Sequence, residues 1–185
     1  MIEIMKGLKI AIVDIETTGL KADYADVICV VIKEYKGREW TVRIDDKRNP
    51  DSTSDKWVVE ETFRILKNFD VLVTWNGTRF DKPFLNTRAF LNGMRKMLHP
   101  MFNRDLIYPA RHKFLFGSRR LKFVAAVVLG KTDKTFTKPK TWKALVRHER
   151  WAIDFMVDHC RKDVSDTEKL YTEFLPYLSE KMERR

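Results

Sequence analysis

The sequence predicts a single α/β domain, residues 1–185, in which a mixed five-stranded sheet is flanked by helices. Three strand patterns with short connections open the chain, which favours three antiparallel strands at the start. A later apolar strand follows a helix, which is the β-α-β step by which a sheet continues with parallel strands. No internal repeat and no linker divides the chain. These observations predict one domain with one central sheet.

The composition is typical of a soluble folded protein, with 44% hydrophobic and 34% charged residues. No apolar run approaches the ~20 residues of a membrane span, and the first residues lack a secretory signal pattern. Cys29 and Cys160 provide neither a disulfide framework nor a metal-ligand spacing. We therefore expect a cytoplasmic protein that does not enter a membrane.

The positive charge of the chain is concentrated in its middle. Residues 79–150 contain 18 basic and 4 acidic side chains, whereas the segments on either side are slightly acidic. Such a segment predicts a surface that binds a polyanion. The alternative is a charged face that serves solubility alone.

The first strand is expected at Leu8–Val13, an apolar and β-branched run typical of a buried central strand. Asp14 and Glu16 follow it two residues apart, so on a continuing strand their side chains leave the same face. Neighbouring carboxylates repel each other and are costly to bury, whereas Mg²⁺ or Mn²⁺ prefers such oxygen ligands. In the alternative interpretation the strand ends at Val13 and both acids are solvated.

The next elements complete the antiparallel half of the sheet. Residues 25–35 read as a second buried strand, residues 36–37 as a turn, and residues 38–44 as a half-buried edge strand. Residues 49–52 break the pattern and offer helix caps. An amphipathic helix is then expected from Trp57 to near Asn68.

The parallel half begins with an apolar strand at 71–75 and a glycine turn at Gly77. The following helix is expected to begin near Asp81, with Pro83 in its first turn, where proline is tolerated. Taken alone, Asp81 is more typical of a helix N-cap than of a functional acid. A fifth short strand is expected at 102–107.

The remainder of the chain is expected to be mainly helical. Leu121–Leu129 predicts a helix closed by Gly130, residues 131–140 predict a mobile basic loop, and a helix is expected from Trp142 almost to the end. Within it, His159 and Asp163 are four residues apart and therefore share a face. A pair of this kind, considered alone, is commonly a surface interaction.

Taken together, these acids occur in a specific order along the chain. The order resembles that of the DEDD superfamily of 3′–5′ exonucleases, which have a ribonuclease H-like fold, and in particular stand-alone proteins similar to the proofreading exonuclease domain of B-family DNA polymerases. The segments that carry the resemblance are Asp14-Ile15-Glu16-Thr17-Thr18, Asn76-x-x-x-Phe80-Asp81-x-Pro83-Phe84-Leu85, Leu121-x-x-Val124-Ala125 with Gly130, and His159-Cys160-x-x-Asp163-Val164-x-x-Thr167-x-x-Leu170-Tyr171. The resemblance therefore spans nearly the whole chain.

The third motif departs from the family pattern. The family has a tyrosine four positions before the final acid or a histidine five positions before it, whereas this chain has His159 at the tyrosine position and Asp158 at the other. With an ordinary pKa near ~6.5, His159 would accept a proton from the attacking water or orient that water. The alternative is that His159 marks a weakened or inactive enzyme.

The resemblance implies hydrolysis of phosphodiester bonds in single-stranded DNA, from the 3′ end, with two divalent cations, Mg²⁺ or Mn²⁺. It implies that Asp14, Glu16 and Asp163 hold the first ion, that Asp14 bridges to the second, and that Asp81 acts on the second through water. DNA is favoured over RNA because the motifs are polymerase-like. A polymerase or another replication or repair protein is the expected partner.

The resemblance also implies a set of nucleic-acid-binding residues. Thr17 would meet the terminal 3′ hydroxyl through its backbone and Leu20 would pack on a base, although turn formation and core burial are open alternatives. Asn76 and Phe80 belong to the second motif, with Phe80 either in the core or stacked on a base. The basic residues of 111–143, including Lys138 and Lys140, would follow the strand's backbone.

Two alternatives to this enzyme remain open at the level of sequence. One is a nucleic-acid-binding module that keeps the fold with weak or no catalysis. The other is a different nuclease on the same scaffold, either a structure-specific nuclease or an exonuclease that trims RNA.

Overall fold

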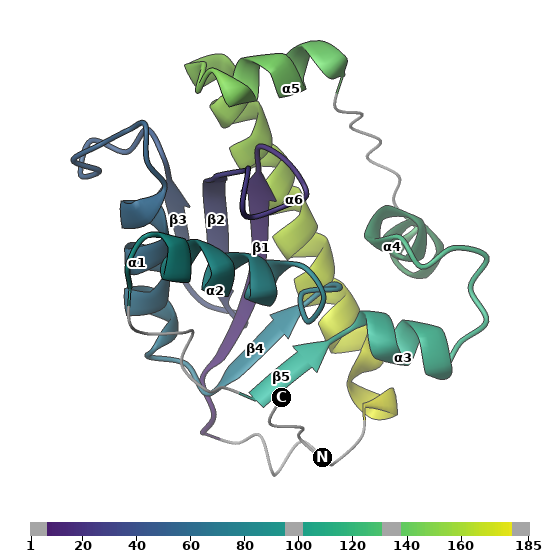
Figure 1. Ribbon diagram of the computed structural model, residues 1–185. Helices are drawn as coiled ribbons and strands as arrows, with labels where there is room; N and C mark the ends of the chain where they lie inside the picture. The colour runs from purple at the N-terminus through teal and green to yellow at the C-terminus, as the bar shows by residue number, and fades with distance from the viewer. Residues whose placement is uncertain (1–6, 95–101, 131–137, 179–185) are drawn as a thin grey trace.

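The computed structural model describes residues 7–94, 102–130 and 138–178, and its five strands form one mixed sheet in the order β3-β2-β1-β4-β5 (Figure 1). β2 is antiparallel to both β1 and β3, whereas β4 is parallel to both β1 and β5. The predicted class, three antiparallel strands continued by parallel ones, is confirmed. The strands are β1 (Ile10–Thr17), β2 (Val27–Glu34), β3 (Glu39–Arg43), β4 (Val71–Thr74) and β5 (Phe102–Asp105).

β1 is the centre of the sheet and is longer than the sequence pattern indicates. It pairs with β4 only from Ile10 to Ile12, but it continues along β2 as far as Thr17. Asp14 and Glu16 therefore lie within the strand, and the interpretation that the strand ends at Val13 is wrong. A bulge between Glu16 and Thr17 marks the end of regular pairing.

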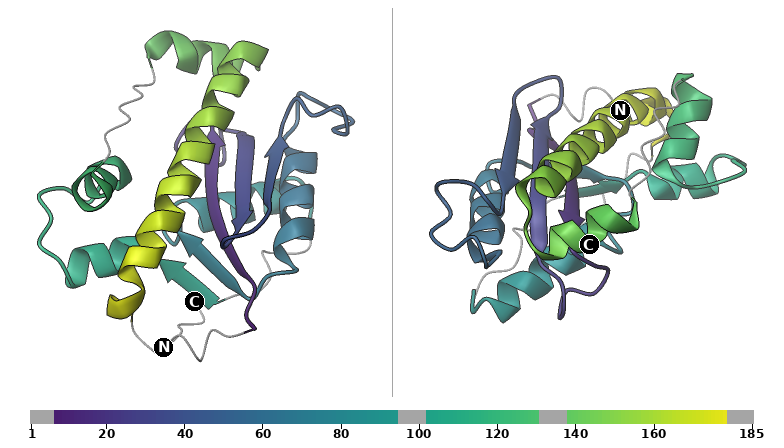
Figure 2. Two further views of the ribbon diagram at one scale, coloured as in Figure 1. Left: turned by 180° about the vertical axis from the view of Figure 1, so that it is seen from behind. Right: turned by 90° about the horizontal axis from the view of Figure 1, so that it is seen from above.

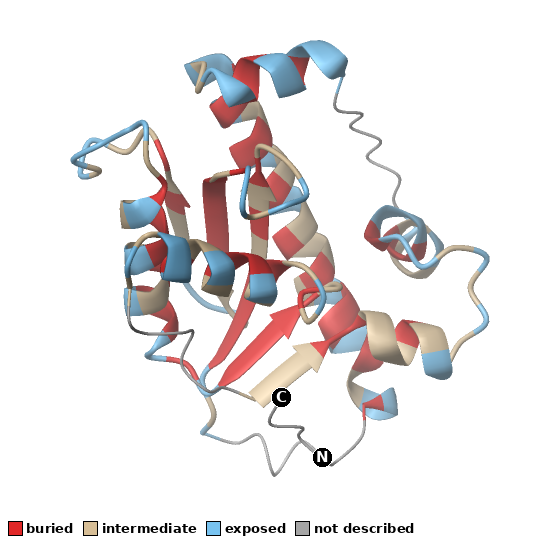
Figure 3. Cartoon of the chain, in the orientation of Figure 1, coloured by how far each residue is buried: buried red, intermediate tan, exposed pale blue. Residues whose placement is uncertain are grey.

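Helices cover both faces of the sheet. α1 (Lys56–Leu66) and α2 (Asp81–Leu91) lie against one face, and α6 (Arg150–Phe174) crosses the other (Figures 1 and 2). The central strands and the inward sides of the helices are buried (Figure 3). Because β1 is covered on both faces, its apolar residues occur as a run rather than in alternation.

The connection after β5 differs from the expected elements. The fifth strand ends at Asp105, and a short helix that was not predicted, α3 (Ile107–His112), follows at once. An oxygen of the Asp105 side chain accepts the Ile107 N–H at 3.2 Å, which helps the chain to turn there. Residues 106–107 therefore belong to the turn and the helix rather than to the strand.

The helical part after α4 (Leu121–Leu129) is divided differently from the prediction. α4 itself is confirmed, and Gly130 closes it in the left-handed conformation at φ 66°. α5 (Pro139–Val146) begins within the segment expected to be a loop, because a proline at the first helical position favours helix initiation. His148 at φ 53° then separates α5 from α6, so the single predicted helix is two. Residues 131–137 of the expected basic loop lie outside the described residues.

Within residues 7–94, 102–130 and 138–178, none of the helices combines the length and apolar character that crossing a bilayer requires.

Candidate active site

The two acids of β1 lie on the side of the sheet that α6 covers. Asp14 and Glu16 are half-buried and pair with Val31 and Cys29 of β2. The Cys160 thiol of α6 donates to the backbone oxygen of Asp14 at 3.3 Å. The helix therefore lies directly against the part of β1 that carries the acids.

α6 contributes the two residues that the sequence placed four apart on one helical face. Nε2 of His159 lies 3.7 Å from Oε1 of Glu16 and 3.9 Å from Oδ2 of Asp163. The side chains of His159 and Asp163 are only 12% and 20% exposed. The interpretation of this pair as a solvated surface interaction is therefore wrong.

Asp81 joins the group from the other side of β1. It is the first residue of α2 and only 6% exposed, and Phe80 occupies the N-cap position, so the N-cap interpretation of Asp81 is wrong. Burial raises the pKa of Asp81 to about 7, and the charge of Asp105 adds to the rise, while hydrogen bonds from the backbone N–H groups of Asp81 and Ile15 oppose it. Ile15 stands between Asp14 and Glu16, which places Asp81 beside both.

The four acids lie close enough to affect one another's ionisation, and we call them the carboxylate cluster (Asp14, Glu16, Asp81 and Asp163). Burial raises the pKa of Asp14 well above its ordinary value, and the charges of Asp81, Glu16 and Asp163 raise it further. Burial likewise raises the pKa of Glu16, with contributions from Cys29, Asp163 and Asp81. Burial also raises the pKa of Asp163 to about 6. Each acid resists ionisation in its present surroundings, which is the condition that a nearby cation relieves.

A lysine of α4 stands beside this cluster, and the sequence motifs did not identify it. Nζ of Lys122 lies 3.3 Å from Nε2 of His159, and its charge lowers the pKa values of Glu16 and Asp163. Burial, followed by the charges of Lys122 and Lys162, lowers the pKa of His159 to about 4. The expectation of an ordinary histidine pKa is therefore wrong, and the ring is neutral at pH 7. The only signal for Lys122 in the sequence is its place between Leu121 and Val124, in the helix that precedes the third motif.

A second buried carboxylate positions the segment before Asp81. Asp105, at the end of β5, is 5% exposed and accepts the backbone N–H groups of Asn76 at 2.7 Å and Thr78 at 2.9 Å. Asn76 adopts the left-handed region at φ 67°, which asparagine tolerates. Asn76 thus shapes the turn that leads from β4 into α2, and Asp105 holds that turn. Motif reasoning did not identify Asp105, because its partners are 27 to 29 residues away along the chain.

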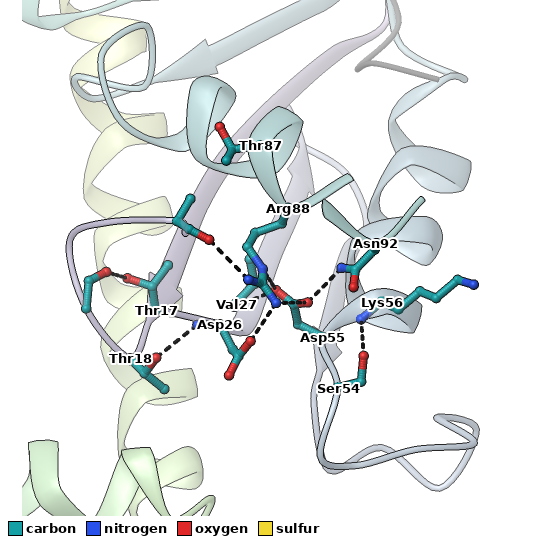
Figure 4. Close-up of polar contacts among 12 residues, drawn as sticks. Thr17, Thr18, Asp26, Val27, Ser54, Asp55, Lys56, Thr87, Arg88 and Asn92 are labelled. Atoms are coloured by element: carbon teal, nitrogen blue, oxygen red, sulfur yellow. Dashed lines mark hydrogen bonds and ion pairs between the residues drawn. The ribbon is translucent and has the colours of Figure 1, made fainter. Parts of the chain in front are cut away.

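A buried ion pair fixes the loop on the other side of β1, residues 18–26 (Figure 4). Asp55 is fully buried and accepts hydrogen bonds from Val27 N–H, from two nitrogens of Arg88 and from Asn92. Arg88 also donates to Asp26 and to the backbone oxygen of Ala22, both within the loop. The loop that follows the acids of β1 is thus tied to α1 and α2.

Thr17 and Leu20, expected to bind the terminal nucleotide, differ in their surroundings. Thr17 is 5% exposed, and its hydroxyl donates to the backbone oxygen of Gly19 at 2.6 Å, as the turn alternative requires. Leu20 is 81% exposed, so the alternative of core burial is wrong for it.

Phe80 packs partly against the core, with its ring 5.4 Å from that of Phe84. Lys138 and Lys140 lie apart from the carboxylate cluster, at the exposed start of α5, where Lys138 is the N-cap residue and Lys140 is in the first turn. Nζ of Lys140 stands 5.9 Å above the ring of Trp151, about 12 Å along α6 from His159 at 1.5 Å per residue.

The donor set of the cluster suits a hard divalent cation, since it offers several carboxylate oxygens whose mutual repulsion such an ion relieves. As the side chains stand, however, no three His, Cys, Asp or Glu groups among residues 7–94, 102–130 and 138–178 are arranged to hold a metal ion.

Comparison with known proteins agrees with this fold. The chain matches, with a TM-score of 0.72 and 19% sequence identity, a solved structure of the family B DNA polymerase from the hyperthermophilic archaeon Pyrobaculum calidifontis. The match covers 92% of this chain and 25% of the polymerase chain, so this protein corresponds to a quarter of that enzyme's length. No curated protein sequence matches the chain.

At this level of identity the likeness to the polymerase establishes the fold alone. Residues 11–175 match the sequence profile of the RNase H superfamily, a span that runs from β1 to the end of α6 and includes every acid of the carboxylate cluster. The chain therefore belongs to the RNase H superfamily.

Proposed function

We propose that this protein is a metal-dependent 3′–5′ exonuclease that hydrolyses single-stranded DNA. One observation carries the proposal: β1, α2 and α6 bring Asp14, Glu16, Asp81 and Asp163 into a single cluster of partly and fully buried carboxylates whose pKa values are raised. A folding argument alone does not account for four such acids in one place. Membership in the RNase H superfamily supports a nuclease.

Asp14, Glu16 and Asp163 would hold one divalent ion, and Asp14 with Asp81 would hold a second. Both ions would be Mg²⁺ or Mn²⁺. When bound, such ions supply activated water and neutralise the developing charge on the phosphate. Asp81 would act through water, because it approaches β1 from the opposite side to Asp163.

His159 is suited to orient the attacking water. Its ring is stacked on Phe155 with an interplanar angle of 7°, and its Nε2 faces Glu16 and Asp163. With a pKa of about 4, the neutral ring accepts a hydrogen bond at Nε2 from the Lys122 ammonium in the metal-free protein. The general-base role assumed a histidine whose pKa lies near neutral pH, and the lowered pKa of His159 does not meet that condition. We therefore assign His159 the role of orienting the attacking water.

A binding module with weak or no catalysis is the second candidate. It is favoured by the Lys122 ammonium, whose Nζ stands 3.3 Å from Nε2 of His159 beside the cluster. The two candidates differ in what a divalent cation does, since the enzyme requires it and the module does not.

Digestion of 5′-labelled single-stranded DNA in Mg²⁺ or Mn²⁺ tests the proposal, with RNA of the same sequence run alongside. The wild type should produce a ladder that shortens from the 3′ end, Asp14→Ala should produce none, and His159→Ala should retain a reduced rate. Asp23→Ala, which removes a carboxylate from the exposed part of the 18–26 loop, is the matched control and should cleave like the wild type. If the protein cleaves RNA faster than DNA, RNA replaces DNA as the proposed substrate. If the strands are bound but not cleaved, the binding module is favoured.

Association with a polymerase or another replication or repair protein is also part of the proposal, because the fold corresponds to a quarter of a family B polymerase. Co-purification with tagged protein from cell extract, compared with the Asp14→Ala variant, tests that association independently of catalysis.

A further inference from the structure

The helix α4 is apolar on every side, yet most of it is not buried. Eight of its nine residues are apolar, with Lys122 as the exception, but only Leu121, Val124 and Ala125 are buried. A helix that is hydrophobic all round is normally enclosed by its neighbours. α4 instead packs chiefly against α6 and lies at the margin of the molecule (Figures 1 and 2). Within the described part of the chain, one side of α4 therefore lacks a covering element.

The uncovered side of α4 presents Phe123, Ala126 and Val127, which are three and four residues apart and share one helical face. Phe123 is 40% and Val127 58% exposed, and Leu115, in the connection from α3, is fully exposed. A Cβ at Gly117 would stand 3.4 Å from the Phe123 ring, so this connection runs beside α4. We call these four apolar side chains the α4 surface (Leu115, Phe123, Ala126 and Val127). Single exposed apolar side chains are ordinary, whereas a group of them marks an interaction site.

The connection that carries Leu115 is anchored on both sides of that residue. The ring of Phe114 stacks on that of Phe174 at the end of α6, with the ring centroids 5.1 Å apart. The indole N–H of Trp75 donates to the backbone oxygen of Arg119 at 3.1 Å. Leu115 is thus held toward solvent by a fixed backbone, so a partner that binds there orders little of the chain.

The segment that forms the α4 surface has basic side chains and no acidic ones. Residues 106–132 contain no Asp or Glu, whereas Lys113, Arg119 and Arg120 are exposed in the connection and at the start of α4. Electrostatic complementarity therefore selects a negatively charged partner for this surface. A second copy of this chain would bring the same basic side chains face to face, and such like-charge contacts act against association.

The apolar side chains favour an acidic protein segment over a nucleic acid. Proteins hold single strands largely by stacking the bases on flat aromatic rings. Leu115, Ala126 and Val127 are aliphatic and offer no ring to a base. Apolar side chains on one helical face instead match the apolar face of an amphipathic helix, whose anchors are also three and four residues apart.

We propose that the α4 surface docks an acidic amphipathic helix of a partner protein. The apolar side chains of that helix would cover the exposed side of α4 together with Leu115, and its carboxylates would face Arg119 and Arg120. The inference deepens the proposed association with another protein and rests on it, but docking requires neither a metal ion nor cleavage.

Fluorescence anisotropy in EDTA tests the docking with a labelled synthetic peptide of leucine, alanine and glutamate, about eighteen residues or five helical turns long, whose leucines lie on one helical face. One comparison peptide has the same composition with the leucines scattered around the helix, and another has lysine in place of glutamate. The variants of the surface are Leu115→Ser, Val127→Glu and Arg119→Glu. Val146→Glu and Arg64→Glu are the matched controls, because Val146 is a 64% exposed valine of α5 and Arg64 a 61% exposed arginine of α1.

The wild type should bind the acidic amphipathic peptide at least about tenfold more tightly than either comparison peptide. Each of the three surface variants should weaken that binding about tenfold, which corresponds to the loss of one interface anchor. The two control variants should bind like the wild type, and thermal melting of every variant checks that it is folded. Equal binding of the scattered peptide, or a Val127→Glu variant that binds like the wild type, would overturn the proposal.

Two further measurements identify the other occupants. If sedimentation shows a wild-type dimer that Val127→Glu converts to a monomer, the α4 surface is a self-interface and the proposal is overturned. It is also overturned if single-stranded DNA displaces the peptide and Val127→Glu weakens DNA binding by the same factor. A wild type that binds the peptide but does not cleave DNA in Mg²⁺ would keep the docking surface and remove the exonuclease, whereas a wild type that cleaves but does not bind the peptide would remove the docking surface alone.

Discussion

Replacing Arg88 with methionine removes the cation that neutralises the fully buried carboxylate of Asp55 while keeping much of the apolar stem of the side chain. Asp55 would keep two of its four hydrogen bonds, from Val27 N–H and Asn92, and would lose the two from Arg88. Leaving one partner of a buried ion pair uncompensated destabilises a protein by about 3–5 kcal/mol. A domain of this size is stable by about 5–15 kcal/mol, so the variant should be folded but close to its limit.

Urea denaturation followed by circular dichroism measures this change, with the midpoint shifting at a constant slope. Arg64→Met is the matched control, because Arg64 is 61% exposed and pairs with Glu61 on the surface of α1. That control should change the unfolding free energy by about 0.5 kcal/mol at most. Asp55→Asn placed in the Arg88→Met background should recover stability, since it removes the unpaired charge.

The reasoning is refuted if Arg88→Met is no more destabilising than Arg64→Met, or if the added Asp55→Asn lowers stability further. Because Arg88 also holds Ala22 and Asp26, the variant should in addition lose cleavage rate at temperatures where it is still folded.

Three further predictions concern the carboxylates. Asp14→Asn should abolish both cleavage and the rise in Tm on adding Mg²⁺. In EDTA the same variant should be more stable than the wild type by roughly 1 kcal/mol, because it lacks one of the mutually repelling charges. An unchanged or lower Tm in EDTA would contradict the repulsion among these acids. The pKa values of about 7 for Asp81 and about 6 for Asp163 exceed the ~3.9 of an unfolded aspartate, so the metal-free folded state binds more protons and loses stability as the pH rises from about 4 to about 7. The Tm difference between Mg²⁺ and EDTA should therefore grow over that range, and calorimetry showing a constant difference would exclude these acids as ligands. Asp105→Ala should lower the free energy of unfolding by about 1–3 kcal/mol, because it leaves the N–H of Asn76 unpaired, and urea denaturation measures this loss. The variant should also cleave about a hundredfold more slowly in single-turnover assays, because Asp81 is displaced. Full activity would show that the turn holds its shape without Asp105.

The order of the five strands and of α1, α2 and α4 was predictable because each of these elements has a local signal. The β-branched run of β1, the glycine turn before α2 and the closing Gly130 of α4 are read from a few neighbouring residues. The start of α2 at Asp81 was correct for this reason. The extension of β1 through the acids was not predictable from local pattern, because its support comes from the pairing partners on β2.

The residues that build the site were predictable only in part. Spacing along the chain identified the acids of the cluster, since each lies in a recognisable motif. Lys122, Asp105 and the pair of Asp55 with Arg88 were missed because each acts on residues far along the chain: Lys122 lies 37 residues from His159, and Asp55 lies 33 from Arg88. A lone buried aspartate has no periodicity that distinguishes it from a solvated one.

The ammonium of Lys122, a residue of α4, stands beside the carboxylate cluster. The affinity of the cluster for a cation would therefore depend on where α4 holds this charge. In the metal-free protein it stands 3.3 Å from His159 and lowers the pKa values of Glu16 and Asp163, so it acts as a counterion within the chain. A divalent cation entering the cluster meets this like charge. By thermodynamic linkage, a ligand that draws the ammonium away strengthens metal binding, and the metal strengthens the binding of that ligand by the same factor. Under the proposed function, a strand phosphate would have the charge to do so, and metal and strand would then strengthen each other's binding.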